Sequence, residues 1–587
     1  MIEKGSKEND DALRTHTLFL RALGKALSRA LSRKPNAKRF EILVVGLLWI
    51  FYATNLVIWE NNNRRLVAFD QVGHFFNSIA IAKIMESPWI LLNLSKFFMV
   101  LAAQHAMYFT FTIYPPFAYL IAGLFYLVLP SSLPVASLSN VIFLLILMFS
   151  VYGLANDLAG SRAALVTAFL VGAYPILVGL SRLYYLDFPL TAMVSLTLLL
   201  LIKTDDFRNR KIVLLLSFTL IAGMLTKQTF PLYVSGPLAY VALKSLRNKA
   251  GVNNLILCAV IASLSIGYYV FLKPGGLGMY LSVYQVEPQL RGDVAQSYPW
   301  IISLKTMAEY GTGIPLFVLF SAGVFDVLRS SRHRVFILVG LVTPIVMLAI
   351  IEPFYPYDPR FIAPILPLVA LASAVLFKDL NRHSRRQVTG AIIVVIFVLA
   401  QYGSITYNEP ILAGILPFTE SEVSTYGIYA PSAQDWRIPQ ILRDLRIDAV
   451  TQHLDRPSVV VLVQSSPYFD QTVFLYYAYV NDVNFQLYPN GAYSSSIGIS
   501  SVCNVNYVVI RLNVNPAELQ SRLAQNVAVV TKFVLSHLAS FVFVGNYTLP
   551  DGTIASLLRR TSSLTCSSNA AAASVRDIPP FERTILA

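Results

Sequence analysis

The stretch ILVVGLLWIFYATNLVIW, residues 42 to 59, contains 18 consecutive residues without a charge. A helix of this length nearly crosses the hydrocarbon core of a bilayer, so the stretch predicts a membrane span. Apolar runs of similar length recur as far as Gln401, which excludes a single signal peptide or anchor. The 587 residues are 55% hydrophobic and 13% charged, and the mean hydropathy is +0.58. The sequence therefore predicts a polytopic α-helical membrane protein.

The apolar pattern predicts about eleven spans, and the distribution of basic residues orients them. The segments expected on the inner side hold 25 Lys and Arg residues, whereas the outer loops before residue 403 hold ten. The positive-inside rule therefore places the N-terminus in the cytoplasm, and an odd number of spans places residues 406 to 587 outside. The expected spans are residues 42 to 59, 135 to 156, 163 to 181, 188 to 203, 212 to 226, 228 to 243, 252 to 272, 311 to 328, 335 to 351, 361 to 377 and 388 to 405.

A large first outer loop, residues 60 to 134, contains two further apolar runs. The run at residues 117 to 129 is short for a span, and counting it as one would turn every later basic cluster outward. We therefore expect it to be a helix lying at the outer interface. The segment at residues 88 to 104 is expected to be a second helix of this kind.

The N-terminal segment, residues 1 to 40, is basic. Within residues 12 to 34, leucines fall on one helical arc and Arg and Lys residues on the other. This pattern predicts a cytoplasmic amphipathic helix on an anionic membrane surface, with a partly disordered basic tail as the alternative.

The C-terminal region, residues 406 to 587, has the pattern of a small α/β domain. Strand-like runs at residues 458 to 464, 505 to 511 and 541 to 547 alternate with helical patterns near residues 436 to 449, 469 to 480 and 516 to 537. Asp551 and Gly552 predict a turn between two strands. Of the three cysteines, Cys258 lies in an expected span, so only Cys503 and Cys566 could pair.

Asp70 and His74 follow the first span and lie one helical turn apart, in RLVAFDQVGH at residues 65 to 74. If this segment is helical the two side chains share a face. An Asp beside open space can act as a general base for a hydroxyl group. The alternative is an Asp that caps a juxtamembrane helix.

Three more ionisable residues stand at the outer ends of spans. Asp187 and Pro189 open one span, which an N-cap interpretation explains fully. Lys227 sits in an outer hairpin and would suit a phosphate, or it could extend to the lipid headgroups. Arg360 opens another span below aromatic residues that include Tyr357. It would suit bidentate phosphate binding with the tyrosine ring against a sugar face, or it could anchor the span at the interface.

The order of these short motifs resembles the GT-C class of membrane glycosyltransferases, in particular the protein O-mannosyltransferase and aminoarabinose transferase branch. The similar motifs cover roughly residues 40 to 380 and are FDQVGH, YPPFAYLIAGLF, LDFPL, GMLTKQ and PRFIAPILPLVALA. The family often has Glu where this chain has Gln71, and Lys or His where it has Tyr114.

The resemblance implies transfer of a sugar from a polyprenyl phosphate carrier to an acceptor on the outer face of the membrane. It implies Asp70 as the catalytic base, and Lys227 and Arg360 near the carrier phosphate. Substrate contacts are expected from these two cations and from His74, Tyr114, Asp187 and Tyr357, with His74 either orienting Asp70 or playing a structural part.

We therefore expect a hexosyl- or pentosyltransferase of the cell envelope, in the plasma (inner) membrane. Its partners would be the lipid-linked donor, a lipid, glycan or protein acceptor, and membrane lipids. Nucleic acid is not expected, because the net charge of +14 comes from basic residues in short loops between spans. No cofactor is expected, although a divalent metal is not excluded. The rival hypotheses are a transporter or flippase of a polyprenyl-linked sugar and a non-catalytic assembly factor.

Overall fold

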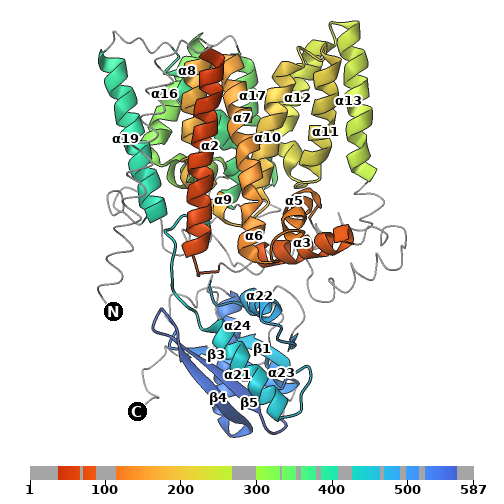
Figure 1. Ribbon diagram of the computed structural model, residues 1–587, viewed down its shortest axis with the longest axis vertical. Coiled ribbons are helices and arrows are strands. Elements are labelled where there is room, and N and C mark those ends of the chain that lie inside the picture. The colour runs from red at the N-terminus through yellow and green to blue at the C-terminus, as the bar shows by residue number, and fades with distance from the viewer. Residues whose placement is uncertain are drawn as a thin grey trace.

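The computed structural model describes residues 37–66, 70–86, 114–267, 299–330, 333–351, 358–378, 385–407, 426–462, 468–488, 498–514 and 522–564. A layer of long helices forms the larger part of the molecule, and a smaller α/β domain lies beyond one end of it (Figure 1). The N-terminal segment 12 to 34 and the run at 88 to 104, both expected to be surface helices, lie outside the described residues.

The helical layer contains long helices that run between its two ends and shorter helices between them (Figure 1). They are α2 (Ala37–Asn62), α7 (Asn140–Ala159), α8 (Ser161–Val171), α9 (Pro175–Arg182), α10 (Asp187–Lys203), α11 (Arg210–Met224), α12 (Phe230–Ser245), α13 (Lys249–Gly267), α15 (Pro299–Thr306), the π-helix η4 (Met307–Thr312), α16 (Ile314–Ser330), α17 (Arg334–Ile351), the 3-10 helix η5 (Pro359–Ile365), α18 (Leu366–Val375) and α19 (Arg385–Tyr407).

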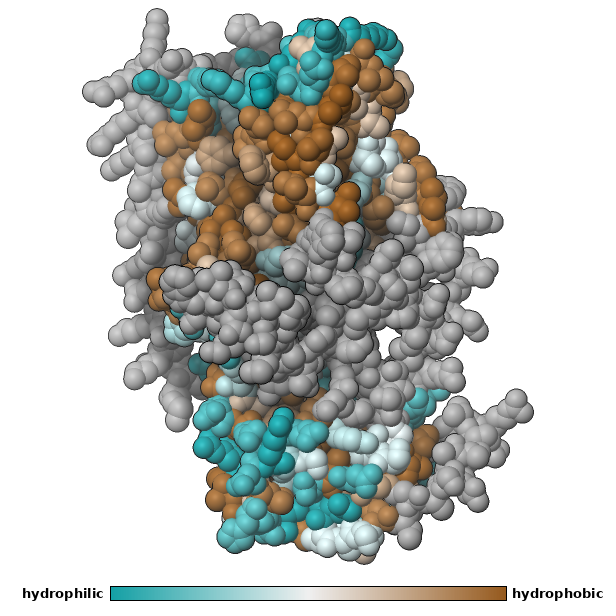
Figure 2. Space-filling model, turned by 90° about the vertical axis from the view of Figure 1, so that its right-hand side faces the viewer, coloured by the Kyte–Doolittle hydropathy of each residue, from teal (hydrophilic) through white to brown (hydrophobic). Residues whose placement is uncertain are grey.

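The outer surface of this layer is apolar, as a lipid-facing surface must be. Figure 2 shows a band of hydrophobic residues over the upper part of the molecule, with hydrophilic residues at its upper edge and over the C-terminal domain. On α11 and α13, Phe218 is 63% exposed and Leu264 is 70% exposed. Exposure of large apolar side chains to water is unfavourable, so their exposure on these helices indicates contact with lipid.

The number of spans stays a prediction. Each of the eleven expected segments overlaps a helix of the structure. By length and composition, four of the described helices could cross a membrane, or up to six if each of two bent pairs is one span. One bent pair joins α8 to α9 at 57°, and the other turns by 117° at Gly313, between η4 and α16. Gly313 has a φ of +81°, a conformation that glycine adopts without steric cost.

Helix α10 lies at the centre of the layer. Most of its residues are buried, because it packs against α7, α11, α12 and η5. A helix that is apolar on all sides is typical of such a central position. Its first residue, Asp187, is therefore held deep in the protein at the end of the layer that faces the C-terminal domain.

Three short helices cover that end of the layer. Helix α3 (Asp70–Glu86) runs across it, packed on α5 (Phe117–Tyr126) and α6 (Leu133–Leu138) (Figure 1). The helix expected within residues 117 to 129 is confirmed as α5. The helical start at Asp70 is also confirmed, and most of α3 is buried, from Gln71 to Ala80 without interruption.

The C-terminal domain is an α/β structure around one five-stranded sheet of order β2-β1-β3-β5-β4. Strand β1 pairs in parallel with β2 and β3, whereas β5 pairs antiparallel with β3 and β4. The strands are β1 (Ser458–Leu462), β2 (Gln486–Leu487), β3 (Tyr507–Leu512), β4 (Phe541–Thr548) and β5 (Ile554–Arg560). The helices are α21 (Ile438–Thr451), α22 (Gln471–Val480), α23 (Ile499–Cys503), α24 (Arg522–Ser536) and the short η9 (Leu538–Ser540).

Two apolar cores hold the helices to the two faces of this sheet. One contains side chains of α21 and α22, and the other contains side chains of α23 and α24. The three expected strands, the three expected helices and the turn at Asp551 and Gly552 are confirmed. Strand β2 was not predicted, because two residues carry no periodicity.

A short segment, residues 426 to 432, ties the C-terminal domain to the helical layer. The Tyr429 carbonyl oxygen accepts hydrogen bonds from Trp59 Nε1 at 2.9 Å and from Arg182 Nη1 at 3.3 Å. Arg182 is buried and lies over the Trp59 ring. A Cβ atom on Gly179 would lie 2.0 Å from the Tyr426 carbonyl oxygen, so this close approach requires glycine. The segment is therefore fixed against the layer.

Candidate functional site

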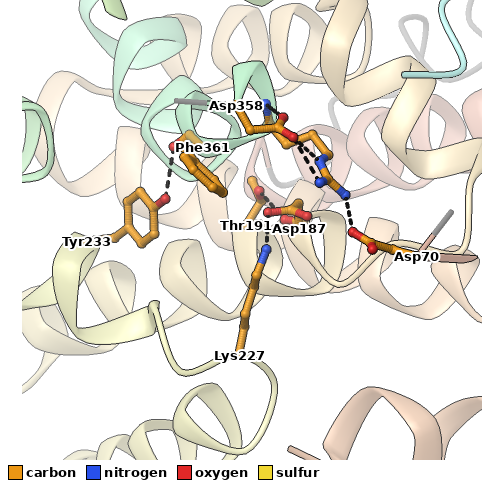
Figure 3. Close-up of polar contacts among 8 residues, drawn as sticks. Asp70, Asp187, Thr191, Lys227, Tyr233, Asp358 and Phe361 are labelled. Carbon is orange, nitrogen blue, oxygen red and sulfur yellow. Dashed lines mark hydrogen bonds and ion pairs between the residues drawn. The ribbon is translucent and has the colours of Figure 1, made fainter. Parts of the chain in front are cut away.

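The outer-loop residues singled out in the sequence meet at the end of the layer that faces the C-terminal domain (Figures 1 and 3). Asp70 begins α3, Asp187 begins α10, Lys227 lies between α11 and α12, and Arg360 lies in η5. Residues 290 positions apart in the chain are thus in direct contact.

Arg360 is shared between two carboxylates. Its backbone nitrogen and its Nε and Nη2 atoms donate to Asp358 at 2.9, 3.1 and 2.9 Å. Its Nη1 atom donates to Asp70 Oδ2 at 3.0 Å. The guanidinium also lies 4.6 Å from the centre of the Tyr185 ring, and its side chain is 13% exposed. Arg360 is therefore mostly buried, paired and stacked, and this placement does not fit its alternative role as an interfacial lipid anchor.

Arg360 and Lys227 act electrostatically on Asp70. Burial alone would raise the pKa of the Asp70 carboxyl group, but Arg360 and, to a smaller extent, Lys227 outweigh burial and lower this pKa below its ordinary value. The Asp358 carboxyl group has a lowered pKa for the same reason, with Arg360 again outweighing burial. Both carboxyl groups are therefore ionised at neutral pH.

Lys227 and Asp187 form a second ion pair beside the first. Lys227 Nζ donates to Asp187 Oδ1 at 2.7 Å, and the two side chains are 9% and 3% exposed. The N-cap position of α10 is occupied by Leu186 and Asp187 is the first helical residue, so the N-cap interpretation of Asp187 is wrong. The alternative of Lys227 extending to lipid headgroups is wrong as well, because the side chain points inward to the Asp (Figure 3).

Local hydrogen bonds place these elements relative to one another. The Asp358 side chain caps η5 through the Arg360 backbone nitrogen, and Pro359 occupies the first helical position. Tyr233 in α12 donates to the Phe361 carbonyl oxygen at 2.9 Å (Figure 3). The backbone nitrogen of Phe117 donates to the Leu225 carbonyl oxygen at 2.8 Å, which joins the start of α5 to the loop that carries Lys227.

His74 is held by tyrosines. Its Nδ1 atom lies 2.8 Å from the Tyr119 hydroxyl group, and its ring packs 5.0 Å from the Tyr114 ring. Burial lowers the pKa of His74 to about 3, and the nearby Lys227 and Arg360 act in the same direction against Asp70. His74 is therefore neutral at physiological pH, and its polar contact is with Tyr119 rather than with Asp70.

The two departures from the family pattern have defined positions. The Gln71 side-chain oxygen accepts a hydrogen bond from the Tyr184 backbone nitrogen at 3.1 Å, and Tyr114 packs on His74. Tyr357, expected against a sugar face, lies outside the described residues.

Sequence reasoning missed Asp358 and Tyr185, although both contact Arg360. The Asp-Pro pair at residues 358 and 359 is an N-cap signal that could have identified Asp358. Across the described ranges, no three His, Cys, Asp or Glu side chains gather as metal ligands would.

Chemically, this arrangement combines a carboxylate with two cations at one partly buried location. An ionised carboxylate can accept a proton from a hydroxyl group, and Arg and Lys side chains stabilise a phosphate. Because each cation is already paired, an incoming anion has to take the place of a carboxylate.

The comparisons with known proteins agree on the fold. Residues 114–268 match a family model described as dolichyl-phosphate-mannose-protein mannosyltransferase. No curated protein sequence matches the chain. Among solved structures, ArnT from Cupriavidus metallidurans in the apo state matches with a TM-score of 0.54 and 14% identity, over 89% of this chain and 98% of that one.

Two ligand complexes match as well. ArnT from the same organism bound to undecaprenyl phosphate gives a TM-score of 0.50 at 14% identity, with 89% of this chain and 98% of that one covered. The oligosaccharyltransferase AglB from Archaeoglobus fulgidus, in complex with an inhibitory peptide and a dolichol-phosphate, gives 0.51 at 12% identity, over 91% of this chain and 75% of that one. The resemblance to the GT-C class is confirmed, and the chain is an integral membrane protein of GT-C fold.

Proposed function

We propose that this protein transfers a sugar from a polyprenyl-phosphate-linked donor to an acceptor at the outer face of the membrane. The contact between Asp70 and Arg360 carries the proposal. It places a candidate base for the acceptor and a candidate ligand for the carrier phosphate 3.0 Å apart, with Lys227 in the same cluster. The complexes of ArnT with undecaprenyl phosphate and of AglB with a dolichol-phosphate support a carrier of this class.

In the proposed reaction, the acceptor hydroxyl oxygen attacks the anomeric carbon of the donor sugar and its proton passes to Asp70. The bond between that carbon and the phosphate oxygen breaks, and polyprenyl phosphate leaves with the electron pair. Arg360 and Lys227 stabilise the negative charge that grows on the leaving phosphate. No nucleotide is required, because the leaving group is the lipid phosphate itself.

The ion pair between Arg360 and Asp70 implies that donor binding precedes proton transfer. The carrier phosphate competes with Asp70 for Arg360, whereas Asp358 keeps Arg360 in place through three hydrogen bonds. Once Arg360 turns to the phosphate, Asp70 loses its main charge partner and its pKa rises from the lowered value. Donor binding thus converts Asp70 from an ion-pair partner into a usable base.

Carrier binding tests the proposal directly. The purified protein is incubated with undecaprenyl phosphate or with undecaprenol and examined by native mass spectrometry. We expect a mass increase that corresponds to bound undecaprenyl phosphate, and much less binding of undecaprenol. The two lipids have the same chain, and only undecaprenyl phosphate is an anion. Equal retention of the two would contradict a phosphate site.

The orientation gives a further prediction, with residues 1 to 40 in the cytoplasm and the C-terminal domain outside. The α12–α13 connection and the C-terminal domain lie at opposite ends of the molecule (Figure 1). Ala250, at the start of α13, and Ala539, in η9 of the C-terminal domain, are exposed. In intact cells, an impermeant thiol reagent should label Ala539→Cys and spare Ala250→Cys, and the reverse pattern would refute this orientation. The disulfide at Cys503 supports an oxidising compartment for this domain.

We further propose the plasma (inner) membrane as the location and a hexose or pentose as the transferred sugar. The acceptor would be a lipid, glycan or protein.

A further inference from the structure

Helix α22 of the C-terminal domain packs against the helix that carries Asp70. The Tyr476 ring lies 5.2 Å from the Phe75 ring, and the Tyr479 ring lies 5.7 Å from Phe75 and 5.5 Å from Phe76. All three contacts have the T-shaped geometry that aromatic pairs favour. In Figure 1, α22 lies directly beyond α3, at the top of the C-terminal domain.

The position of these contacts along α3 links them to the site. Phe75 and Phe76 follow His74 directly and lie within two turns of Asp70. Both rings are buried, at 0% and 2% exposure. A shift of α3 at Phe75 would therefore move Asp70, because one rigid helix carries both residues.

Further contacts fix the C-terminal domain around α22. The Tyr476 hydroxyl oxygen accepts a hydrogen bond from the Leu133 backbone nitrogen at the start of α6. The Arg65 guanidinium, just after α2, lies 4.3 Å from the centre of the Tyr468 ring. The Arg64 backbone nitrogen donates to the Ser432 carbonyl oxygen at 2.8 Å. The domain is thus held at several points around α22.

We propose that Tyr476 and Tyr479 of α22 are positioning residues that set the place of α3, so that Asp70 reaches Arg360 and the acceptor. This inference rests on the proposed function and gives the C-terminal domain a part in it. The two residues act through α3 and touch no reacting atom.

Arg360 has a second ion-pair partner that does not lie on α3. A displacement of α3 can therefore be distinguished from a general loss of stability. Asp358 binds Arg360 independently of α3, and Asp187 binds Lys227 from α10. A displacement of α3 would therefore separate Asp70 from Arg360 and leave both cations in place. The expected signature is a fall in kcat with carrier binding retained.

Tyr479 is the better test residue, because it is 41% exposed and belongs to neither of the two apolar cores of the domain. Tyr479→Ala should lower kcat about tenfold or more, since a misplacement of a catalytic group by about 1 Å can cost about 100-fold. The KM for the donor and the binding of undecaprenyl phosphate should stay within about twofold of wild type. Tyr479→Phe keeps the ring and should restore wild-type kcat.

Val480→Ala is the matched control, on the same helix and with a similarly exposed side chain of 48%. It should leave kcat unchanged. Hydrogen exchange measured by mass spectrometry adds a readout that needs no activity. In Tyr479→Ala, amides of α3 should exchange faster while those of α10 keep their rate.

Equal kcat in Tyr479→Ala and Val480→Ala would overturn the inference. So would unchanged exchange in α3, or a loss of carrier binding in step with kcat. A wild-type protein that transfers no sugar and binds no undecaprenyl phosphate would contradict the proposed function instead, and the exchange measurement would still decide whether α22 positions α3.

Discussion

Replacing Asp70 by Asn is expected to lower sugar transfer by at least about 100-fold, the lower end of the contribution of a positioned general base. The amide has nearly the shape of the carboxylate, and its oxygen can still accept the Arg360 Nη1 hydrogen bond seen at 3.0 Å. It cannot take the acceptor proton. Binding of undecaprenyl phosphate should persist, because Arg360 keeps Asp358 and Lys227 keeps Asp187.

Asp157→Asn is the control for this experiment. Asp157 is also paired with a cation, Lys203, at 2.6 Å, but it lies at the far end of α7 from the site. Its replacement should leave transfer unchanged. If Asp70→Asn retained near wild-type transfer at saturating donor, Asp70 would not be the base, and its part would be the pairing of Arg360 alone.

Replacing Lys227 or Arg360 by Gln is expected to weaken undecaprenyl phosphate binding by about 1.5 to 3 kcal/mol each, or roughly 10- to 150-fold. Arg360→Lys should fall between Gln and wild type, since Lys keeps the charge and loses the planar fork. Binding can be measured by titrating the detergent-purified protein with a fluorescently labelled carrier and recording the fluorescence.

Arg360→Gln also leaves two carboxylates without their cation. Asp358→Asn in the same chain relieves this repulsion, so the double variant separates loss of the phosphate ligand from damage to the site. Lys378→Gln is the control. Lys378 Nζ lies 2.8 Å from Asp326 Oδ2, and this ion pair is not part of the cluster. A variant lacking both Lys227 and Arg360 that bound the carrier as tightly as wild type would show that neither cation contacts the phosphate.

The general fold could be predicted from the sequence because lipid imposes a strong constraint on composition. Runs such as residues 42 to 59 and 388 to 405 lack charge and coincide with α2 and α19. The breaks were harder, because Gly313 and the residues that join α8 to α9 interrupt helices inside otherwise apolar runs. Backbone geometry at such breaks depends on packing with neighbouring helices, as in the fit of Gly179 against Tyr426.

The ionisable residues of the site could be identified from the sequence, but their pairing could not. Asp187 and Lys227 are 40 positions apart, and Asp70 and Arg360 are 290 apart. Neither spacing has a period that predicts contact. Considered singly, Lys227 and Arg360 matched lipid anchoring as well as ligand binding, because each stood at the end of an apolar run. Only the tertiary fold shows that both are turned inward.

If the site binds the proposed carrier, the sharing of Arg360 between two carboxylates affects which lipids can occupy it. Among the described residues that meet there, three carboxylates stand against two cations, so the cluster has no surplus positive charge. The abundant anionic phospholipids of a bacterial or organellar membrane therefore gain nothing from simple electrostatic attraction. A lipid that enters has to offset the loss of an internal ion pair, and contacts to its isoprenoid chain and its sugar can do so. Selection of a scarce carrier over a large excess of ordinary headgroups follows from that requirement.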